Sequence, residues 1–66
     1  MAAAGRIRVL LVEPRRIYAA TVARHLRAGD FAVEVASSPA AALIGLRDRD
    51  PDVVVVGVGT QGLGTA

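Results

Sequence analysis

The stretch RIRVLLVEP, residues 6–14, decides the fold that the sequence predicts. After Arg8 it is almost continuously apolar and rich in branched side chains, which is typical of a strand covered on both faces in a parallel sheet. Pro14 stops the strand, and proline is tolerated in the first turn of a helix. We therefore predict a central strand over residues 6–12 and a helix from about Pro14 to Ala28.

This first helix is predicted to bury one face. At helical spacing, one apolar arc comprises Tyr18, Ala19, Val22, Ala23 and Leu26, and a neighbouring arc carries Arg16, Arg24 and Arg27. We expect Tyr18 in the core with its hydroxyl at the edge. Gly29 is expected to end the helix.

A second strand and a second helix follow. FAVEVAS, residues 31–37, alternates valines with Glu34, which is the pattern of an edge strand with one face in water. Ser38 and Pro39 form an N-cap and a first-turn proline, so a helix is expected to run to about Arg49. The apolar residues at helical spacing in this segment are Ala42, Leu43 and Leu46.

The stretch PDVVVVGV, residues 51–58, predicts a third strand, also buried. Strands alternating with helices predict an α/β fold with a three-stranded parallel sheet and right-handed crossovers. The 66 residues allow one small domain. We expect it to span residues 6–59, after a disordered N-terminus (1–5) and before a flexible glycine-rich tail (60–66).

Composition excludes several classes of protein. Hydrophobic residues make up 53% of the chain, but no run reaches the roughly 20 apolar residues of a membrane span. The chain has no cysteine, which fits the reducing cytoplasm. Its net charge of +2 comes with one Phe, one Tyr and no Trp, so basic and aromatic residues do not interleave as in nucleic-acid-binding proteins.

Three stretches together carry a resemblance to a known family. They are RVLLVEP (8–14), SSPAAALIGLR (37–47) and RDPDVVVVGV (49–58). With them the chain resembles the N-terminal half of a bacterial response-regulator receiver domain. The resemblance implies a partial flavodoxin-like fold with strand order 2-1-3, in which the first and third strands end side by side.

In that family, a carboxylate at the end of the third strand accepts a phosphoryl group, and a pair of acidic residues after the first strand holds Mg²⁺. Gly57 stands at the phosphoacceptor position and has no side chain. Glu13 stands for one member of the acidic pair, and Pro14 takes the place of its neighbour. A single carboxylate is a poor Mg²⁺ site. We therefore expect no catalytic residue, no metal and no cofactor, and the chain is predicted not to be an enzyme.

The resemblance implies a regulatory module that acts by protein–protein contact, as a truncated part of a response regulator. Arg16, Arg24 and Arg27 form a candidate partner surface on the first helix. The outer edge of the valine strand lacks a neighbour in a three-stranded sheet, and unpaired edges invite pairing with another chain. Self-association or a protein partner is therefore expected, or else a missing second half of the domain.

An alternative interpretation starts from the glycines. Gly57, Gly59 and Gly62 spell G-x-G-x-x-G directly after a strand, the pattern that brings backbone amides to a pyrophosphate. On this hypothesis the chain is the N-terminal fragment of a nucleotide-binding protein. The fingerprint is normally carried by a first strand and continues into a helix, and here two strands come before it. We therefore favour the receiver-like interpretation.

Overall fold

The computed structural model describes residues 5–57 of the chain. Its elements are β1 (Arg8–Val12), α1 (Arg16–Ala28), β2 (Ala32–Ala36), α2 (Pro39–Arg49) and β3 (Val53–Val56). All five predicted elements are present, although α1 begins two residues later than expected. Apart from Gly5, the predicted disordered N-terminus (1–5) and the predicted flexible tail (60–66) lie outside the described residues.

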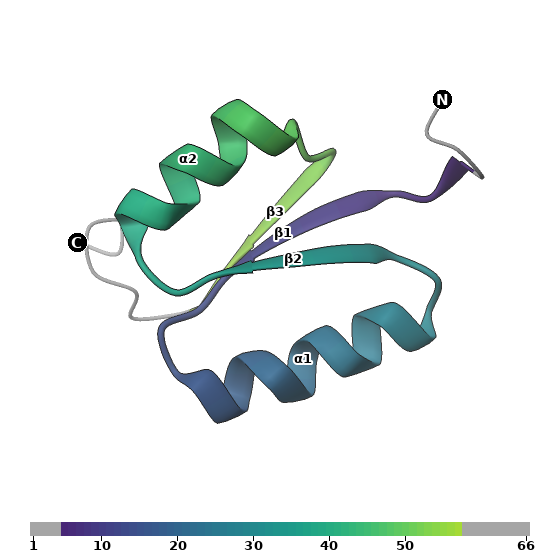
Figure 1. Ribbon diagram of the computed structural model, residues 1–66. Helices are drawn as coiled ribbons and strands as arrows, with labels where there is room; N and C mark the ends of the chain where they lie inside the picture. Colours follow the sequence, from purple (N-terminus) through teal and green to yellow (C-terminus); the bar gives the residue numbers. More distant parts are fainter. Residues whose placement is uncertain (1–4, 58–66) are drawn as a thin grey trace.

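The sheet is parallel, with strand order β2-β1-β3, which confirms the predicted α/β arrangement. Val12 at the end of β1 aligns with Ala36 of β2 on one side and with Val56 of β3 on the other. The chain steps from β1 outward to β2 and then back across β1 to β3, so right-handed connections put the helices on opposite faces. Figure 1 shows α1 and α2 on these two sides of the sheet.

The core consists of two thin layers, one on each face of β1. Leu10 and Val12 pack with Ala36 and Ala42 under α2. On the other face Leu11 packs with alanines of α1, and Val22 and Val33 complete that layer. Because the helices present small residues, their backbones lie close to the sheet.

Gly45 shows how close α2 lies to β1. A Cβ added at this position would meet Cδ1 of Leu10 at 3.1 Å. Gly45 is therefore part of the helix face that covers the sheet, a role that the apolar pattern did not predict.

The ends of the helices follow the sequence signals. Oγ of Ser38 accepts a hydrogen bond from the Ala41 N–H at 3.1 Å, which confirms the predicted N-cap before Pro39. Gly29 is the C-cap of α1, as predicted. The left-handed backbone conformation falls on the next residue, Asp30, with φ of 71°.

The prediction that Tyr18 lies in the core is wrong. Ala19 and Ala23 of the predicted arc are buried, but Tyr18 is 55% exposed. Its ring lies under the Arg15 guanidinium, 4.2 Å from the ring centroid. On the helix, Tyr18 lies well away from the face that carries the buried Ala19 and Ala23, so it stays at the surface.

The apolar face of α2 also differs from the prediction. Ala42 is buried, but Leu43 and Leu46 are exposed. Ala41 and Ile44 border a hollow beside β2, so the two leucines, on the opposite side of the buried Ala42, lie toward β3.

The third strand is not buried, contrary to the prediction. All four valines of β3 are exposed by 38–45%. Neither helix contacts β3, and among residues 5–57 no strand pairs with its outer edge. We name as the β3 patch the four partly exposed valines of β3, Val53, Val54, Val55 and Val56, together with the exposed Leu43 and Leu46 of α2.

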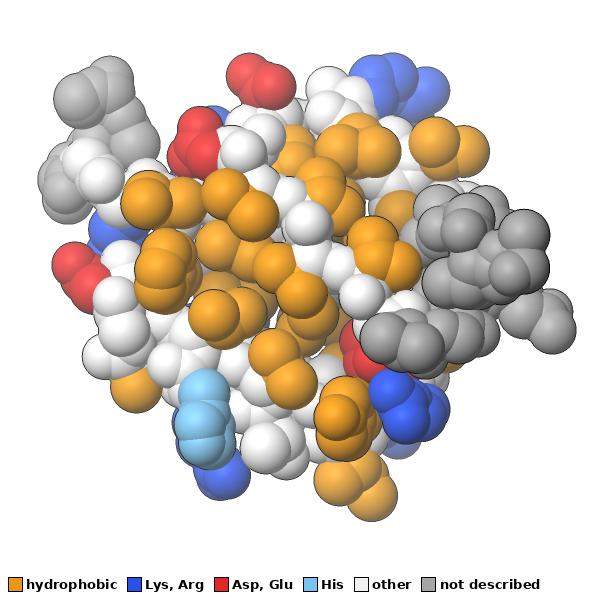
Figure 2. Space-filling model, turned by 180° about the vertical axis from the view of Figure 1, so that it is seen from behind, with side chains coloured by type: hydrophobic (Ala, Val, Ile, Leu, Met, Phe, Trp, Pro, Cys, Tyr) orange, Lys and Arg blue, Asp and Glu red, His pale blue; other side chains and the backbone are white. Residues whose placement is uncertain are grey.

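The β3 patch contains apolar residues that the sequence predicts to be buried and that the structure leaves partly exposed. Neither helix contacts β3, so its valines stay partly exposed within residues 5–57. Figure 2, seen from behind the view of Figure 1, shows hydrophobic side chains gathered across the middle of the molecule. Within the part of the chain that the structure describes, neither helix has the length and apolar character needed to cross a membrane.

Candidate functional site

The candidate site lies where β1 and β3 end. The Gly57 N–H donates to the Val12 carbonyl at 2.9 Å, and the Glu13 N–H donates to the Ala36 carbonyl at 2.9 Å. The first bond holds Gly57 beside the end of β1, and the second ties Glu13 to the end of β2, both at the carboxyl edge of the sheet. In parallel α/β sheets ligands bind at this edge, next to the point where the strand order reverses.

Glu13 is charged and yet buried, with 3% of its surface exposed. Its carboxylate is held by Arg15, two residues further along the chain. The Arg15 Nε donates to Oε2 at 2.8 Å and Nη2 donates to Oε1 at 3.2 Å. The backbone N–H of Arg15 also donates to Oε2, at 3.0 Å. A buried carboxylate requires such partners, because removing an unpaired charge from water is costly.

The electrostatics of this pair follow from those hydrogen bonds. The Arg15 side chain, and then its backbone N–H, lower the pKa of Glu13, and burial opposes them only in part. The same hydrogen bond raises the pKa of Arg15. Both groups are therefore charged at neutral pH, and the site carries its own counter-ion.

The structure leaves no room for a side chain at position 57, so a glycine is needed there. A Cβ at this position would lie 2.9 Å from Cδ of Glu13 and closer still to Oε1. The Glu13 carboxylate thus fills the position where the side chain of residue 57 would begin. Sequence reasoning identified the absence of a side chain at Gly57, and the structure adds that a neighbouring carboxylate excludes one.

Sequence reasoning missed Arg15. The sequence signal was present, since Glu-Pro-Arg puts opposite charges two residues apart around a proline that restricts the turn. Tyr18 then supports the guanidinium from the side. Positively charged Arg15, not a second carboxylate, is the neighbour of Glu13 at this site.

No group of three or more His, Cys, Asp or Glu side chains lies within ion-binding distance among residues 5–57. A cation at Glu13 would have to displace the Arg15 guanidinium. His25 is exposed, and its Nδ1 lies 3.1 Å from the Thr21 carbonyl oxygen.

The three arginines of the candidate partner surface do not all lie in the same place. Arg16 and Arg27 lie along a groove of about 590 Å³ between α1 and β2, whose lining includes Ala20. Arg27 also donates to the Val33 carbonyl at 3.0 Å. Arg24 does not line this groove. Two of the three predicted residues are therefore brought together.

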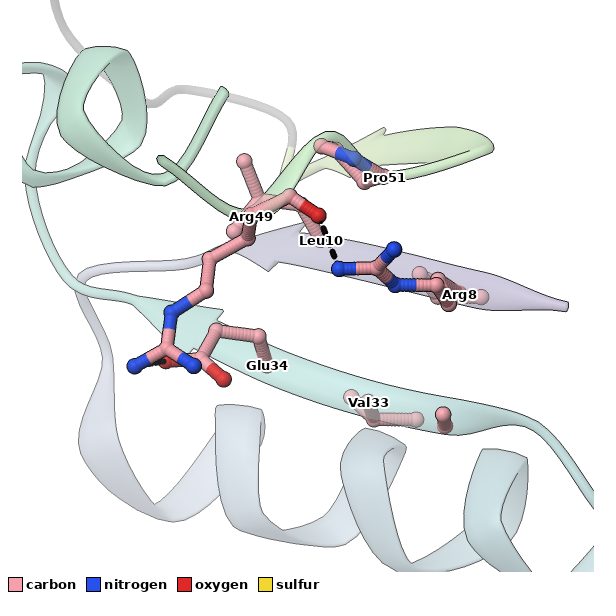
Figure 3. A pocket seen from close by; sticks show the side chains of 8 residues that line it. Arg8, Leu10, Val33, Glu34, Arg49 and Pro51 are labelled. Carbon is pink, nitrogen blue, oxygen red and sulfur yellow. Dashed lines mark hydrogen bonds and ion pairs between the residues drawn. The ribbon is translucent and has the colours of Figure 1, made fainter. Parts of the chain in front are cut away.

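A second cavity, of about 180 Å³, lies at the amino end of the sheet (Figure 3). The Arg8 guanidinium donates to the Arg49 carbonyl, and the Arg49 side chain lies 3.9 Å from a Glu34 oxygen. These contacts tie the end of α2 to β1 and β2. We assign this cluster a structural role, because ligands of parallel sheets bind at the opposite edge.

Of the three glycines of the nucleotide fingerprint, Gly57 is described, whereas Gly59 and Gly62 lie outside the described residues. No protein-family model, no curated protein and no solved structure matches the chain. The resemblance to a receiver domain and the nucleotide alternative therefore both stay predictions.

The Glu13–Arg15 pair predicts a specific acid response. The folded pKa of Glu13 lies below its unfolded value of about 4.3, so the stabilisation is fully present above that pH and is lost as pH falls through the folded pKa. Urea midpoints measured from about pH 6 to pH 2 should fall in the acid range. Glu13→Gln should flatten that decline, because it removes the titrating group.

Glu34→Gln is the matched control for this prediction. Glu34 is exposed, and its nearest ion-pair partner is 3.9 Å away. Its removal should leave the acid slope nearly unchanged. An equal flattening in both variants would contradict the role given to Arg15.

Proposed function

We infer that the chain is a non-phosphorylatable, receiver-like regulatory module of two-component signalling, part of a response regulator, that acts by protein–protein contact. One observation supports this most directly: the buried Glu13 carboxylate, held by Arg15, occupies the space beside Gly57 and excludes a side chain there. A phosphoacceptor needs a carboxylate with a free oxygen and a cation beside it. Here the carboxylate present already accepts three hydrogen bonds.

The rest of the proposal follows from the surface. A module without a covalent switch transmits information by what binds to it, and the β3 patch gives a large apolar area for binding. The cysteine-free composition supports a cytoplasmic location. In this role Arg15 holds Glu13 in one state, as a bound cation would in an active receiver.

The phosphorylation half of the proposal is tested with acetyl phosphate and Mg²⁺. In an active receiver, a carboxylate oxygen attacks phosphorus, the bond to the acetyl oxygen breaks and acetate leaves. We expect the intact mass of the chain to stay unchanged after this treatment. A stoichiometric, base-labile phosphoryl adduct would overturn the proposal.

Two variants locate any adduct that forms. Glu13→Gln abolishes an adduct on Glu13, whereas Glu34→Gln removes an exposed carboxylate from outside the site. An adduct that survives Glu34→Gln and disappears in Glu13→Gln would make Glu13 a phosphoacceptor. No change of mass in any of the three proteins is the expected result.

A further inference from the structure

The groove between α1 and β2 carries positive charge toward both of its ends. Arg16 lines it at the start of α1 and Arg27 lines it near the end of the same helix. At helical spacing the two arginines share one stripe of α1 with Ala20 and Ala23. They lie about 16 Å apart along the helix axis, at about 1.5 Å per residue. A ligand that meets both charges must therefore be elongated.

The residues of the groove do not balance this positive charge. Within residues 5–57 the Arg16 side chain has no hydrogen-bonding or ion-pair partner. Arg27 donates to the Val33 carbonyl, which is a neutral group. The acidic residue of the lining is Glu13, which is buried and already paired with Arg15. The groove is thus complementary in charge to an acidic partner.

The outer edge of β2 offers backbone groups to the same groove. The Ala36 carbonyl accepts the Glu13 N–H and so faces inward, and by the alternation of a strand Val33 and Val35 face outward. The bond from Arg27 to the Val33 carbonyl agrees with this direction. Among residues 5–57 no strand pairs with this edge. Because Val35 also lines the groove, an extended chain there can reach its N–H and C=O groups.

The middle of the groove suits a peptide better than a nucleic acid. Between the two arginines the lining consists of small or apolar side chains, which are Ala19, Ala20, Ala23 and Val35. It contains no aromatic ring on which a base could stack, as proteins that bind single-stranded nucleic acids use. Small side chains on α1 also let a second backbone approach the helix closely. The charges at the ends and the apolar middle together describe the ligand.

We propose that the groove between α1 and β2 binds an acidic, extended peptide segment of a protein partner. The segment lies along β2, exchanges backbone hydrogen bonds with Val35, and places acidic side chains beside Arg16 and Arg27. At about 3.3 Å per residue, roughly five residues of extended chain span the distance between the arginines. The proposal rests on the proposed function, in that it names a partner for the contact module.

Fluorescence anisotropy with a labelled synthetic peptide tests the proposal. The probe has a glutamate at each end and alternating valine and threonine between them. It should bind the unmodified chain at about 0.15 M salt, a condition that screens distant charges. A second probe with lysine in place of both glutamates should not bind.

Three arginine variants test where the charge acts. Arg16→Gln and Arg27→Gln should each weaken binding of the glutamate probe about three- to fivefold, the upper range for exposed ion pairs. Arg24→Gln is the matched control, because it removes the same charge from the same helix at a position that does not line the groove. It should change the affinity less than about twofold.

Amide chemical shifts of the isotope-labelled chain locate the bound probe. The Val35 N–H should shift strongly, together with the residues of α1 that line the groove. Shifts centred on β3 would place the peptide at the other edge of the sheet and overturn the proposal. If Arg27→Gln unfolds because the bond to Val33 is lost, Arg16→Gln and the shift map still decide. Circular dichroism checks the folding of each variant.

Three further results would overturn the proposal. They are no binding of the glutamate probe up to about 1 mM, equal weakening by all three arginine variants, and equal binding of the lysine probe. These outcomes are separate from the phosphodonor result. A chain that binds the probe and accepts a phosphoryl group refutes only the proposed function, and a chain that does neither refutes only the peptide groove.

Discussion

Gly57→Ala is expected to destabilise the fold by about 1–3 kcal/mol, the usual cost of an extra methylene in a packed site. The new Cβ would lie 2.9 Å from Cδ of Glu13 and closer to Oε1. Because Glu13 is buried and held by Arg15, its carboxylate cannot turn away without losing those hydrogen bonds. Urea unfolding followed by circular dichroism measures the loss.

A double-mutant cycle separates this clash from a general intolerance of alanine. In the Glu13→Ala background the obstructing carboxylate is gone, so Gly57→Ala should cost far less. Gly29→Ala is the matched control, since its Cβ would meet only ordinary contacts, at 3.4 Å from the Leu26 carbonyl oxygen. It should change stability by about 0.5 kcal/mol or less. Equal losses in both Glu13 backgrounds would refute the steric account.

Leu10→Ala is expected to cost about 2–5 kcal/mol, the range for removing a large buried side chain. Leu10 is 1% exposed and packs against Ala42 and Gly45 of α2. A 66-residue domain has roughly 3–10 kcal/mol of net stability at the usual value per residue. The variant should therefore lose most of its cooperative unfolding transition, as monitored by thermal melting.

The comparison for Leu10 is Ile17→Ala. Ile17 is 82% exposed on α1, so its truncation removes little buried surface and should shift stability by about 0.5 kcal/mol or less. A loss at Ile17 as large as that at Leu10 would show that the core is not where the structure puts it.

The order of elements and of strands was predictable from sequence, and the reason is local. The apolar run before Pro14 defines the central strand, and Ser38-Pro39 defines the start of α2 by its hydrogen-bonding chemistry. The right-handedness of the crossovers then leaves few possible arrangements of the helices around the sheet. None of these predictions depends on which surfaces of the helices and strands are buried.

The burial of individual side chains was predicted less well. An apolar pattern identifies the apolar face of a helix or strand, but it does not identify the element that packs against that face. Tyr18 and Leu46 belong to the apolar arcs predicted for their helices, yet both are exposed. The β3 valines have the composition of a central strand and the position of an edge. The error at β3 has a plain physical cause: within residues 5–57 no helix and no further strand covers it.

One part of the candidate site was predictable from the sequence and the other part was not. Strand order alone brings Glu13 and Gly57 to the same edge of the sheet. The Arg15 contact depends on the turn at Pro14, where two side chains of opposite charge meet only if the backbone bends in one way. Hydrophobic periodicity carries no information about such a turn.

The central place of β1 has a consequence for how the chain assembles. The strand made first is the template for both others, so β1, α1 and β2 can associate as a unit before β3 exists. Strand β3 joins across a gap of more than 40 residues, the separation of Val9 from its partner Val53, and adds no helix contact of its own. We therefore expect β3 to be the last strand to dock and the first to detach, so that any cover over its outer side would slow its detachment.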